Sequence, residues 1–498
     1  CAPQVPASPH RSVRPRDASA GARRTMTDTS VIDVAIVGGG FAGAAVAYHL
    51  AHLKPRASIA VFEPRSFLGG GLAYDDQDPA HRINVPAARM SLLPQDDGHF
   101  ARWIAETGIG GDDPDIATRD GALYPQRRVF GLYVSAQLAP LLAQGRIAHV
   151  RSRVVSVAQD GGRWTLAPAA GPHYRARSVV VATTHPAPDV PAALAPLGPD
   201  PRLIRDALAP DALSTIGRDA TVVIVGTGLT MADVVASLDR QGHRGKIVAL
   251  SRRGLRSRGH AAQASEPFGD FTSPAPASAL LRTVRDTIRH AAALGLPWQS
   301  VIDAVRAHAQ TFWPKLAREE RSRIVRHLRV YWDVHRFRVA PQVEDVIDRR
   351  ISAGSLEIRA ASVVAASARS DHIALSIRPR GRSDVETIEA DRIVVTTGPA
   401  HSKVISAQPY LAGLAASGYI AADQLGLGLA CDAQSRAHDA SGRALPSLFV
   451  AGPLARAQFG ELMGLPQVSA HALSVAENVA ESLSDEARIS ARSIAAAK

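Results

Sequence analysis

The sequence predicts an α/β fold with two Rossmann-like dinucleotide-binding domains, the second of which carries an all-helical insertion. A short apolar strand pattern followed by a glycine-rich turn occurs twice, at residues 31–43 and 221–231. Each turn opens a helical pattern and then a further strand pattern, as in a βαβ unit. The rhythm of strands and helices is broken by long amphipathic stretches over about residues 275–350.

Length and composition limit the class of protein. A chain of 498 residues, 46% of them hydrophobic, is long enough for two or more domains. Its two cysteines, Cys1 and Cys431, exclude a disulfide framework and favour a cytoplasmic protein. We expect no membrane span, because Asp33 and three glycines interrupt the apolar run at 31–53. No other run approaches the ~18–20 residues that a span needs.

The positive charge of the chain is concentrated in one segment. Lys and Arg outnumber Asp and Glu by 57 to 46, a net charge of +11. Residues 252–338 hold sixteen basic and seven acidic residues, so they carry 16 − 7 = +9 of it. Such a segment attracts anions, and a solvated arginine-rich helical surface explains it equally well. No nucleic-acid-binding motif accompanies the charge, so we expect no nucleic-acid partner.

The first glycine-rich turn follows the β-branched run Val31–Val37 and predicts a dinucleotide site. Gly38 permits the tight turn, and Gly40 lets the backbone approach a pyrophosphate. Gly43 allows the following helix to pack closely on the strand.

The residues after this turn strengthen the prediction. The helix begins near Phe41, which is a further candidate FAD-binding residue, and its free N–H groups suit phosphate oxygens. The next strand pattern, residues 58–62, ends at Glu63. A carboxylate at that position can accept hydrogen bonds from the adenosine ribose.

The second glycine-rich turn follows the apolar run 221–225 and contains Gly226, Gly228 and Thr230. The third glycine position is Met231, so the helix here need not pack as closely as the first. The next strand pattern ends in Arg252 and Arg253 rather than in an acid. Arginine suits a 2′-phosphate, which a carboxylate would repel, so this site predicts NADPH in preference to NADH. The alternative is a vestigial Rossmann half that binds nothing.

Two such units in one chain are more informative than either alone. The usual reason for the pair is that one unit holds FAD while the other delivers a nicotinamide to it, so we assign FAD to the first turn. Two further strand ends, 179–186 and 393–399, look like the strands by which two-dinucleotide-domain flavoproteins pass between domains. A third, 448–453, looks like their final FAD-contacting strand. A helix from about Pro466 to Leu483 is expected after it, with its positive N-terminal end toward the flavin.

These units divide the chain. We expect residues 1–30 to be a disordered tail, since they are rich in Pro, Arg, Ser and Ala without periodicity. Met26 is the expected natural start, and a transit-like presequence is the alternative. The remaining segments are predicted as 31–195 (FAD-binding domain, first part), 196–398 (NAD(P)H-binding domain with the helical insertion at about 275–350), 399–485 (FAD-binding domain, second part) and 486–498 (C-terminal tail).

Beyond the two turns, the chain resembles a bacterial family of FAD/NAD(P)-binding proteins related to class B flavin monooxygenases, whose relatives include FAD-dependent urate hydroxylases. The resemblance covers nearly all of residues 31–483. Phe337 replaces a usual His, while Ser469 and His471 replace a usual Arg and Gln, so a substrate cannot be carried over. The segments that carry the resemblance are 70–74, 81–90, 226–231, 298–303, 310–313, 326–341 and 460–466.

The resemblance implies further cofactor-binding residues. It implies that Asn84, Pro86 and Met90 lie near the isoalloxazine ring of FAD, and that Gly71 belongs to the same site. It also implies that Gly452 and the turn of Leu465 and Pro466 contact FAD.

The insertion contains three amphipathic patterns, 280–293, 301–312 and 321–334. We expect them to form a lid that excludes water from the flavin. His335 and Arg336 are candidate ligands of an anionic substrate or of the nicotinamide phosphates, and a surface salt bridge or helix cap is the alternative.

These features favour an FAD-dependent, NAD(P)H-consuming monooxygenase that hydroxylates a small molecule with O₂ through a flavin C4a-hydroperoxide. No protein nucleophile is needed, and the sequence has neither a nucleophile elbow nor metal-ligand spacing, so no catalytic residue and no metal site are predicted. The alternatives are an NAD(P)H dehydrogenase or reductase with another acceptor, and a non-catalytic FAD-binding sensor. The oligomeric state stays open.

Overall fold

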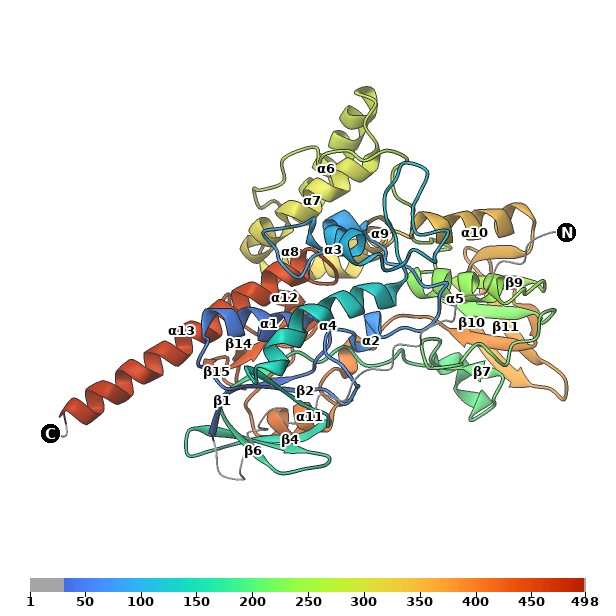
Figure 1. The fold of residues 1–498 in the computed structure, drawn as a ribbon. Helices are drawn as coiled ribbons and strands as arrows, with labels where there is room; N and C mark the ends of the chain where they lie inside the picture. The colour runs from blue at the N-terminus through green and yellow to red at the C-terminus, as the bar shows by residue number, and fades with distance from the viewer. Residues whose placement is uncertain (1–30, 497–498) are drawn as a thin grey trace, which may run out of the picture.

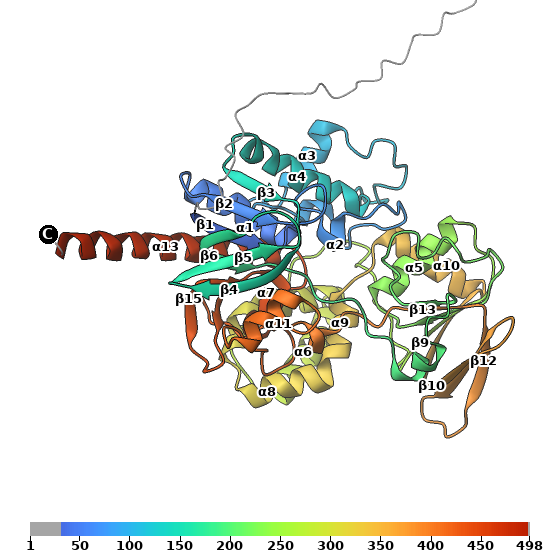
Figure 2. The ribbon, with the colours of Figure 1, turned by 90° about the horizontal axis from the view of Figure 1, so that it is seen from below.

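The structure is a computed structural model that describes residues 31–496. The expected tail at residues 1–30 lies outside this range. The described chain forms two bodies, each built on a mostly parallel sheet (Figure 1). In Figure 2 the first sheet lies beside the long C-terminal helix, and the second lies on the opposite side of the molecule.

The first sheet is assembled from both ends of the described chain. Its strand order is β14-β15-β6-β1-β2-β3, and β4 pairs with β5, which pairs with β6. The apolar run 31–37 forms β1, which pairs in parallel with β2 and β6. The late strand β15 pairs in parallel with β6, so residues after 400 complete this domain. The strands are β1 (Val31–Val37), β2 (Ile59–Phe62), β3 (Ile147–Val150), β4 (Val154–Asp160), β5 (Arg163–Pro168), β6 (Tyr174–Val181), β14 (Arg436–His438) and β15 (Ala444–Val450).

The second sheet has the strand order β12-β11-β10-β9-β8-β13-β7. The pairs from β10 to β7 are parallel, and β11 and β12 add an antiparallel edge. The central strand β8 is fully buried, as its unbroken apolar run requires. The strands are β7 (Leu203–Ile204), β8 (Val222–Val225), β9 (Ile247–Ser251), β10 (Leu356–Ala368), β11 (Ile373–Pro379), β12 (Glu386–Ala390) and β13 (Arg392–Val395).

Helices cover the first sheet because each presents an apolar face. The helix α1 is apolar almost all round and is buried between the sheet and α13, the last helix. Helix α13 runs well beyond the predicted end at Leu483. The helices of this body are α1 (Phe41–Leu53), α2 (Gly71–Tyr74), α3 (His99–Thr107), α4 (Arg127–Ala143), α11 (Pro409–Ala416), α12 (Arg456–Phe459) and α13 (Gln467–Ala496).

The stretch between β9 and β10 is largely helical, and its helices pack in two different places. The predicted amphipathic patterns form α6 (Ala277–Ala293), α7 (Trp298–Phe312) and an interrupted helix made of α8 (Arg318–Arg323), a π-helical turn (Ile324–Leu328) and α9 (Arg329–Arg336). The following helix, α10 (Pro341–Ser352), packs on α5 (Leu229–Arg240) of the second sheet. Residues 341–352 therefore complete the second Rossmann unit.

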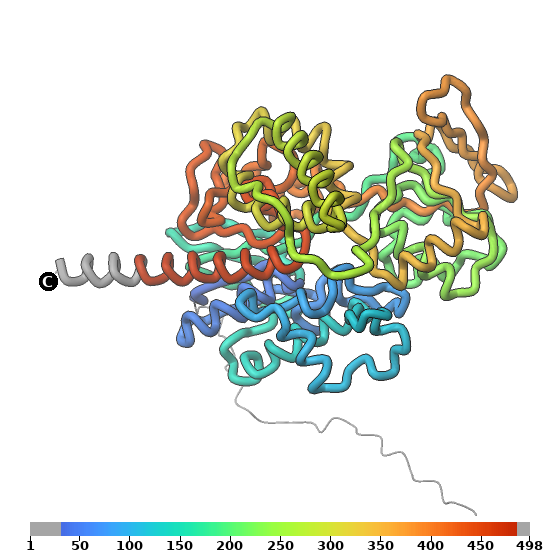
Figure 3. Tube along the Cα trace, turned by 90° about the horizontal axis from the view of Figure 1, so that it is seen from above, coloured from blue at the N-terminus to red at the C-terminus, as the bar shows by residue number. Residues whose placement is uncertain are grey.

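The helices α6–α9 pack against the first body. Buried Trp313 donates a hydrogen bond from Nε1 to the carbonyl oxygen of Ala457, 2.9 Å away. A Cβ on Gly460 would lie 2.8 Å from the Trp313 ring, so the two backbones are in close contact. Figure 3 shows these yellow helices beside the red C-terminal segment and away from the second sheet. Within residues 31–496, no helix is both long and apolar enough to cross a bilayer.

Candidate dinucleotide sites and the polar groups between them

The first glycine-rich turn has the tight geometry that its sequence predicts. Gly38 has φ of +105°, a conformation that favours glycine. A Cβ on Gly43 would lie 1.9 Å from the Gly38 carbonyl oxygen, so only glycine lets α1 approach β1 this closely. The neighbouring strand end is equally near, because a Cβ on Gly38 would lie 2.7 Å from the carbonyl oxygen of Ala182.

The N-terminus of α1 is open to a ligand. Gly40 is the residue before the helix, and no side chain caps the free N–H groups of the first turn. Gly71, with φ of +53°, lies against it: a Cβ there would be 2.7 Å from the Gly40 Cα. Two glycine backbones thus meet where a pyrophosphate is expected.

Glu63 lies at the end of β2, as predicted. Its carboxylate is buried and accepts a hydrogen bond from the Gly39 N–H at 3.0 Å through Oε2. Its other oxygen accepts from Arg65, both from the backbone N–H and from Nη1, each at 3.1 Å. The carboxylate is therefore held at the turn, beside the position expected for the adenosine ribose.

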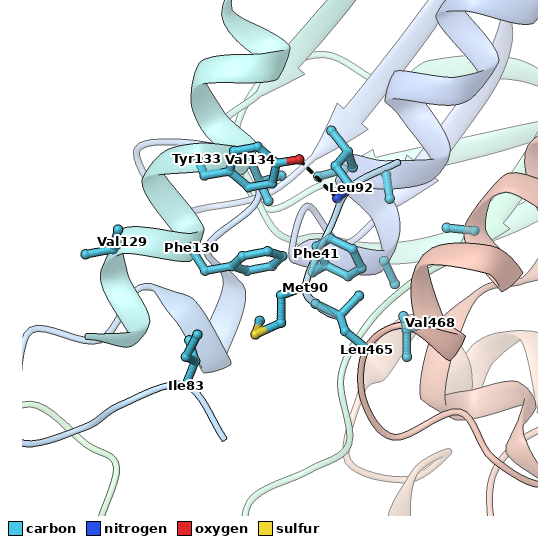
Figure 4. Packing of buried hydrophobic residues seen from close by; sticks show 14 of the residues in the cluster. Phe41, Ile83, Met90, Leu92, Val129, Phe130, Tyr133, Val134, Leu465 and Val468 are labelled. Carbon is cyan, nitrogen blue, oxygen red and sulfur yellow. Dashed lines mark hydrogen bonds between the residues drawn. The ribbon is translucent and has the colours of Figure 1, made fainter. Parts of the chain in front are cut away.

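Three of the predicted FAD-contacting side chains from distant segments come together. Phe41 on α1, Met90 and Leu465 belong to one buried cluster, together with Phe130 of α4 and Val468 of α13. Figure 4 shows Met90 between Phe130 and Leu465, with Phe41 facing them. These residues are far apart in the sequence, and local patterns do not show that they meet. The fold brings them together.

Gly452 lies over the start of α1. It has φ of +72°, and a Cβ there would lie 2.7 Å from the Cβ of Ala42. Its N–H donates to Nδ1 of His471 at 3.2 Å, and the other ring nitrogen of His471 lies 3.0 Å from the Ser435 hydroxyl. Burial lowers the pKa of His471 to about 4, so the ring is neutral and can accept this hydrogen bond.

The other unusual residues also have partners. Ser469, fully buried, donates its hydroxyl to the carbonyl oxygen of Leu92 at 3.0 Å. Phe337 lies beneath the guanidinium of Arg336, whose Cζ is 4.7 Å from the ring centre.

Asn84 and Pro86 lie in a partly buried loop beside the second body. The Asn84 carbonyl oxygen accepts a hydrogen bond from Nε2 of His260 at 3.0 Å. Burial, with a contribution from Arg338, lowers the pKa of His260 to about 4. A neutral ring therefore joins the loop expected near the isoalloxazine to the segment that follows β9.

The second glycine-rich turn is more open than the first. Gly226 has φ of +124°, and a Cβ there would lie 2.3 Å from the Thr396 carbonyl oxygen, so this glycine is structural. A Cβ on Gly228 would meet nothing within 4 Å. Gly228 precedes α5, whose first turn, containing Thr230, has no side-chain cap. Open space beside free N–H groups is what a nucleotide phosphate requires.

The two arginines after β9 differ in their surroundings. Arg253 donates from Nη1 to the Tyr331 hydroxyl at 2.7 Å and lies over its ring. Arg252 is exposed and has no hydrogen bond or ion pair within the described part of the chain. Arg252 is therefore the one of the two whose guanidinium is free to meet a 2′-phosphate.

The segments that follow the two predicted crossover strands meet each other. Pro188 and Pro399 form an antiparallel bridge, and Lys403 pairs with Asp189 at 2.7 Å. Thr183, at the end of the first crossover strand, shares a 2.7 Å hydrogen bond with the Tyr410 hydroxyl.

A buried polar network joins the two bodies at a second place. Arg127 of α4 pairs with Asp233 of α5 at 2.7 Å. Nε2 of His81 lies 2.9 Å from the Ser237 hydroxyl, which donates to Asp78 at 2.6 Å. Burial lowers the pKa of His81, but its hydrogen bond to Asp76 and the charge of Asp233 outweigh that effect, so the net pKa is raised. A protonated ring can donate from both nitrogens, as this arrangement needs.

Both residues predicted to bind an anion have protein partners, and Arg336 has a charged one. It is buried and pairs with Glu461 through Nε at 2.6 Å. Nδ1 of His335 lies 2.7 Å from the Tyr331 carbonyl oxygen, and its ring meets Trp298 edge to face.

The structure also brings together polar residues that sequence reasoning missed. Arg306 of α7 is half-buried. It donates to the Leu465 carbonyl oxygen and, at 2.5 Å, to Gln467 Oε1. Burial, with the nearby charge of Arg336, lowers the pKa of Arg306 to about 9. The only available signal was a charged residue within the apolar pattern of 301–312, which does not name a partner.

The residues present fit the two nucleotides. The uncapped start of α1, the Gly40–Gly71 contact and buried Glu63 form a cradle suited to the ADP half of FAD. The open Gly228 turn and free Arg252 suit the phosphates of NADPH.

Comparison with known proteins agrees with this geometry. Residues 35–186 match the model of a family described as FAD-NAD(P)-binding. No curated protein sequence matches the chain.

Solved structures extend the likeness to the whole fold. The reduced form of ornithine hydroxylase from Pseudomonas aeruginosa superposes with a TM-score of 0.62 at 15% identity, over 91% of this chain and 100% of that one. The ornithine N-hydroxylase of Kutzneria sp. 744, with reduced FAD, NADP⁺ and L-ornithine, gives 0.59 at 17% identity, over 90% and 99%. The FAD-bound cadaverine monooxygenase of Erwinia amylovora gives 0.60 at 11% identity, over 90% and 94%.

At these identities the solved structures establish the fold. Residues 35–186 thus resemble the FAD-NAD(P)-binding family, and the described chain shares the two-body fold of these hydroxylases.

Proposed function

We propose that this protein is an FAD-dependent, NAD(P)H-consuming oxidoreductase, and specifically a monooxygenase acting on a small molecule with O₂. The observation that carries the proposal is the pair of glycine-rich turns, each opening an uncapped helix, in one chain with a hydroxylase fold. One turn would hold FAD and the other NADPH.

The chain's own residues would bind and orient the two cofactors. Gly40, Gly71 and the N–H groups of α1 would hold the pyrophosphate of FAD, and Glu63 its ribose. Met90, Gly452 and the turn of Leu465 and Pro466 would surround the flavin. On the second body, Gly228 and Thr230 would hold the NADPH pyrophosphate and Arg252 its 2′-phosphate.

Flavin supplies hydride acceptance and oxygen chemistry when bound, so the protein need not provide a nucleophile. The contribution expected of the chain is to exclude water and orient the substrate. The helices α6–α9 support this role, since they pack on residues 455–467 beside the expected flavin position. Their action as a lid is part of the proposal.

We also propose a cytoplasmic location. Within the described residues the one cysteine, Cys431, is a buried free thiol, which suits a reducing compartment.

The proposal is tested with protein purified after expression with ample riboflavin. We expect a yellow protein that oxidises NADPH in air and, with a substrate present, consumes NADPH and O₂ in equal amounts. NADPH oxidation that depends on an added electron acceptor would instead identify a reductase. A colourless protein that does not take up added FAD would overturn both.

A further inference from the structure

A polar cluster lies outside both nucleotide turns: His185 and Arg456 in it are buried, His401 and Arg329 are half-buried, and the charges of the two arginines act on both histidines. His185 follows the first crossover strand, and His401 follows the second. Arg456 begins α12, and Arg329 begins α9. We call these four residues the crossover cluster.

The two histidines of the crossover cluster face each other without hydrogen bonds that explain their burial. Their ring centres are 4.4 Å apart, nearly perpendicular. Neither ring nitrogen of His185 has a partner, and Nδ1 of His401 has none either, although all three atoms are buried. Buried polar atoms without partners are rare in folded proteins and call for a missing ligand.

Arg456 lacks a counter-charge as well as a hydrogen-bond acceptor. It is 7% exposed, and its Nε is buried without an acceptor. No described acidic side chain lies within ion-pair distance of it, since the nearby Glu461 pairs with Arg336. Arg329 pairs with Asp333 at 3.4 Å, a long contact. A buried guanidinium without a counter-charge is costly, and a bound anion would remove that cost.

The residues around the crossover cluster also carry a net positive charge. Besides Arg329 and Arg456, three arginines lie in the adjoining network: half-buried Arg306, and Arg336 and Arg338, which are buried. Among the described residues, three acids face these five arginines: Asp303, Asp333 and Glu461. Both histidines are neutral at pH 7, because burial and the charges of Arg456 and Arg329 lower their pKa values to about 4 and about 3. The network therefore holds two positive charges more than negative ones.

We propose that the crossover cluster binds the carboxylate of an anionic substrate, with Arg456 as its main ligand and His185 and His401 as hydrogen-bond donors. That the bound anion is a substrate rests on the proposed function; that the cluster binds an anion does not. The solved structures with the same fold include an ornithine hydroxylase and a cadaverine monooxygenase. Cadaverine carries two protonated amines and no carboxylate, so the excess of positive charge around the cluster would repel it, and we expect a substrate with a carboxylate here.

Binding to the FAD-loaded protein tests the proposal by calorimetry. The probes are acetate, benzoate and glutarate, each compared with its amide, and cadaverine as a dication of the same carbon number as glutarate. We expect at least one acid to bind ten times more tightly than its amide, and cadaverine not to bind. If no acid binds better than its amide, the proposal is wrong.

Variants locate the site. Arg456→Gln should weaken binding of the acid about 10- to 150-fold, as loss of a charged hydrogen bond of about 1.5–3 kcal/mol predicts. Arg289→Gln is the matched control, because it removes the same charge from an exposed ion pair on α6 and should leave affinity unchanged. Equal weakening in both variants would mean a diffuse electrostatic effect and would overturn the assignment.

Two further outcomes separate this inference from the proposed function. If Arg456→Gln loses FAD while the parent protein binds no acid, the anion in the cluster is a phosphate of FAD and the substrate assignment is wrong. If the protein binds acids but never takes up FAD, the anion site stands and the proposed oxidoreductase function fails.

Discussion

At the scale of single residues, we propose that Arg252 decides the nucleotide preference. Its guanidinium is exposed and unpaired within the described chain, whereas Arg253 is held by Tyr331. We expect Arg252→Ala to lower the ratio of kcat/KM for NADPH over NADH by about 10- to 150-fold, since one charged phosphate contact contributes about 1.5–3 kcal/mol. Steady-state kinetics with both nucleotides measure this ratio.

Arg253→Ala serves as the comparison. It should change the ratio less, because its side chain already has a partner. An unchanged ratio in Arg252→Ala, or a larger loss in Arg253→Ala, would contradict the assignment of the 2′-phosphate to Arg252.

His471 is a residue whose role emerges only from the fold. It stands where the related family has another residue, and it accepts the N–H of Gly452 while it is itself buried. We expect His471→Leu to leave that N–H unsatisfied and to cost about 1–3 kcal/mol of unfolding free energy. Denaturant unfolding measures the loss, and His471→Asn, which keeps an acceptor, should recover part of it. Equal stability of the Leu variant and the parent would show that this hydrogen bond is unimportant.

At the scale of elements, the two glycine-rich turns predict opposite responses to the same substitution. Gly43→Ala places a Cβ 1.9 Å from the Gly38 carbonyl oxygen, so we expect a loss of about 1–3 kcal/mol in unfolding free energy and reduced FAD content. Gly228→Ala has open space, so stability should change by less than about 1 kcal/mol while the KM for NADPH rises about tenfold.

Thermal unfolding and nucleotide kinetics on both variants check this pair. A Gly228→Ala protein that is destabilised as strongly as Gly43→Ala would show that the second turn is structural. An unchanged KM for NADPH would remove the nucleotide from that turn.

The contrast between these turns also shows what sequence can reveal. The positions of Gly38, Gly43 and Glu63 follow from local spacing, because strand, turn and helix are consecutive in the chain. The strand runs and the amphipathic helices follow from periodicity for the same reason. Most of these elements are found where their patterns predict them, but the pattern at 321–334 is interrupted by a π-helical turn.

The partners of the insertion could not be read in this way. In the sequence, residues 277–336 lie between two strands of the second sheet. In space, they pack on residues 455–467 of the first body. Arg336 meets Glu461 across 125 positions, and no periodic pattern links two such residues. Likewise, His185 and Arg456 each look like ordinary loop residues until the fold brings them together.

At the scale of the whole molecule, the buried pair of Arg127 and Asp233 couples the two bodies. Removing one partner leaves an uncompensated buried charge, which costs about 3–5 kcal/mol. We expect Asp233→Ala to lower stability more than Arg127→Met with Asp233→Ala together, and to split a single unfolding transition into two. Calorimetry resolves the transitions. If the single and double variants unfold alike in one step, this contact does not couple the bodies.

Acid should destabilise the molecule before its carboxylates titrate. Burial is the main cause that lowers the pKa values of His49, His185, His260 and His471 to about 4 and of His401 to about 3. In the unfolded chain these rings bind protons near pH 6.5. Their contribution to stability is thus complete above pH 6.5 and is lost as the pH falls toward 4.

His81 acts in the opposite sense, because its raised pKa stabilises the protonated form, but it is one group against six, since burial also lowers the pKa of His243. We expect the unfolding free energy to fall by several kcal/mol between pH 7.5 and 5, on the order of 1 kcal/mol for each ring. Denaturant titrations at these pH values measure it. A flat profile over this range would mean that the rings are not buried as neutral groups.

The packing of residues 277–336 on the first body also affects how the two bodies can move. The chain passes between the bodies in two doubled connections: one where Pro188 meets Pro399, the other where Gly259 pairs with Val339. A lobe joined by one such pair can swivel about it, whereas two pairs at different places remove that freedom. Hydride delivery in this protein should therefore proceed without a large rotation of the nucleotide lobe, from an arrangement already set when the chain has folded.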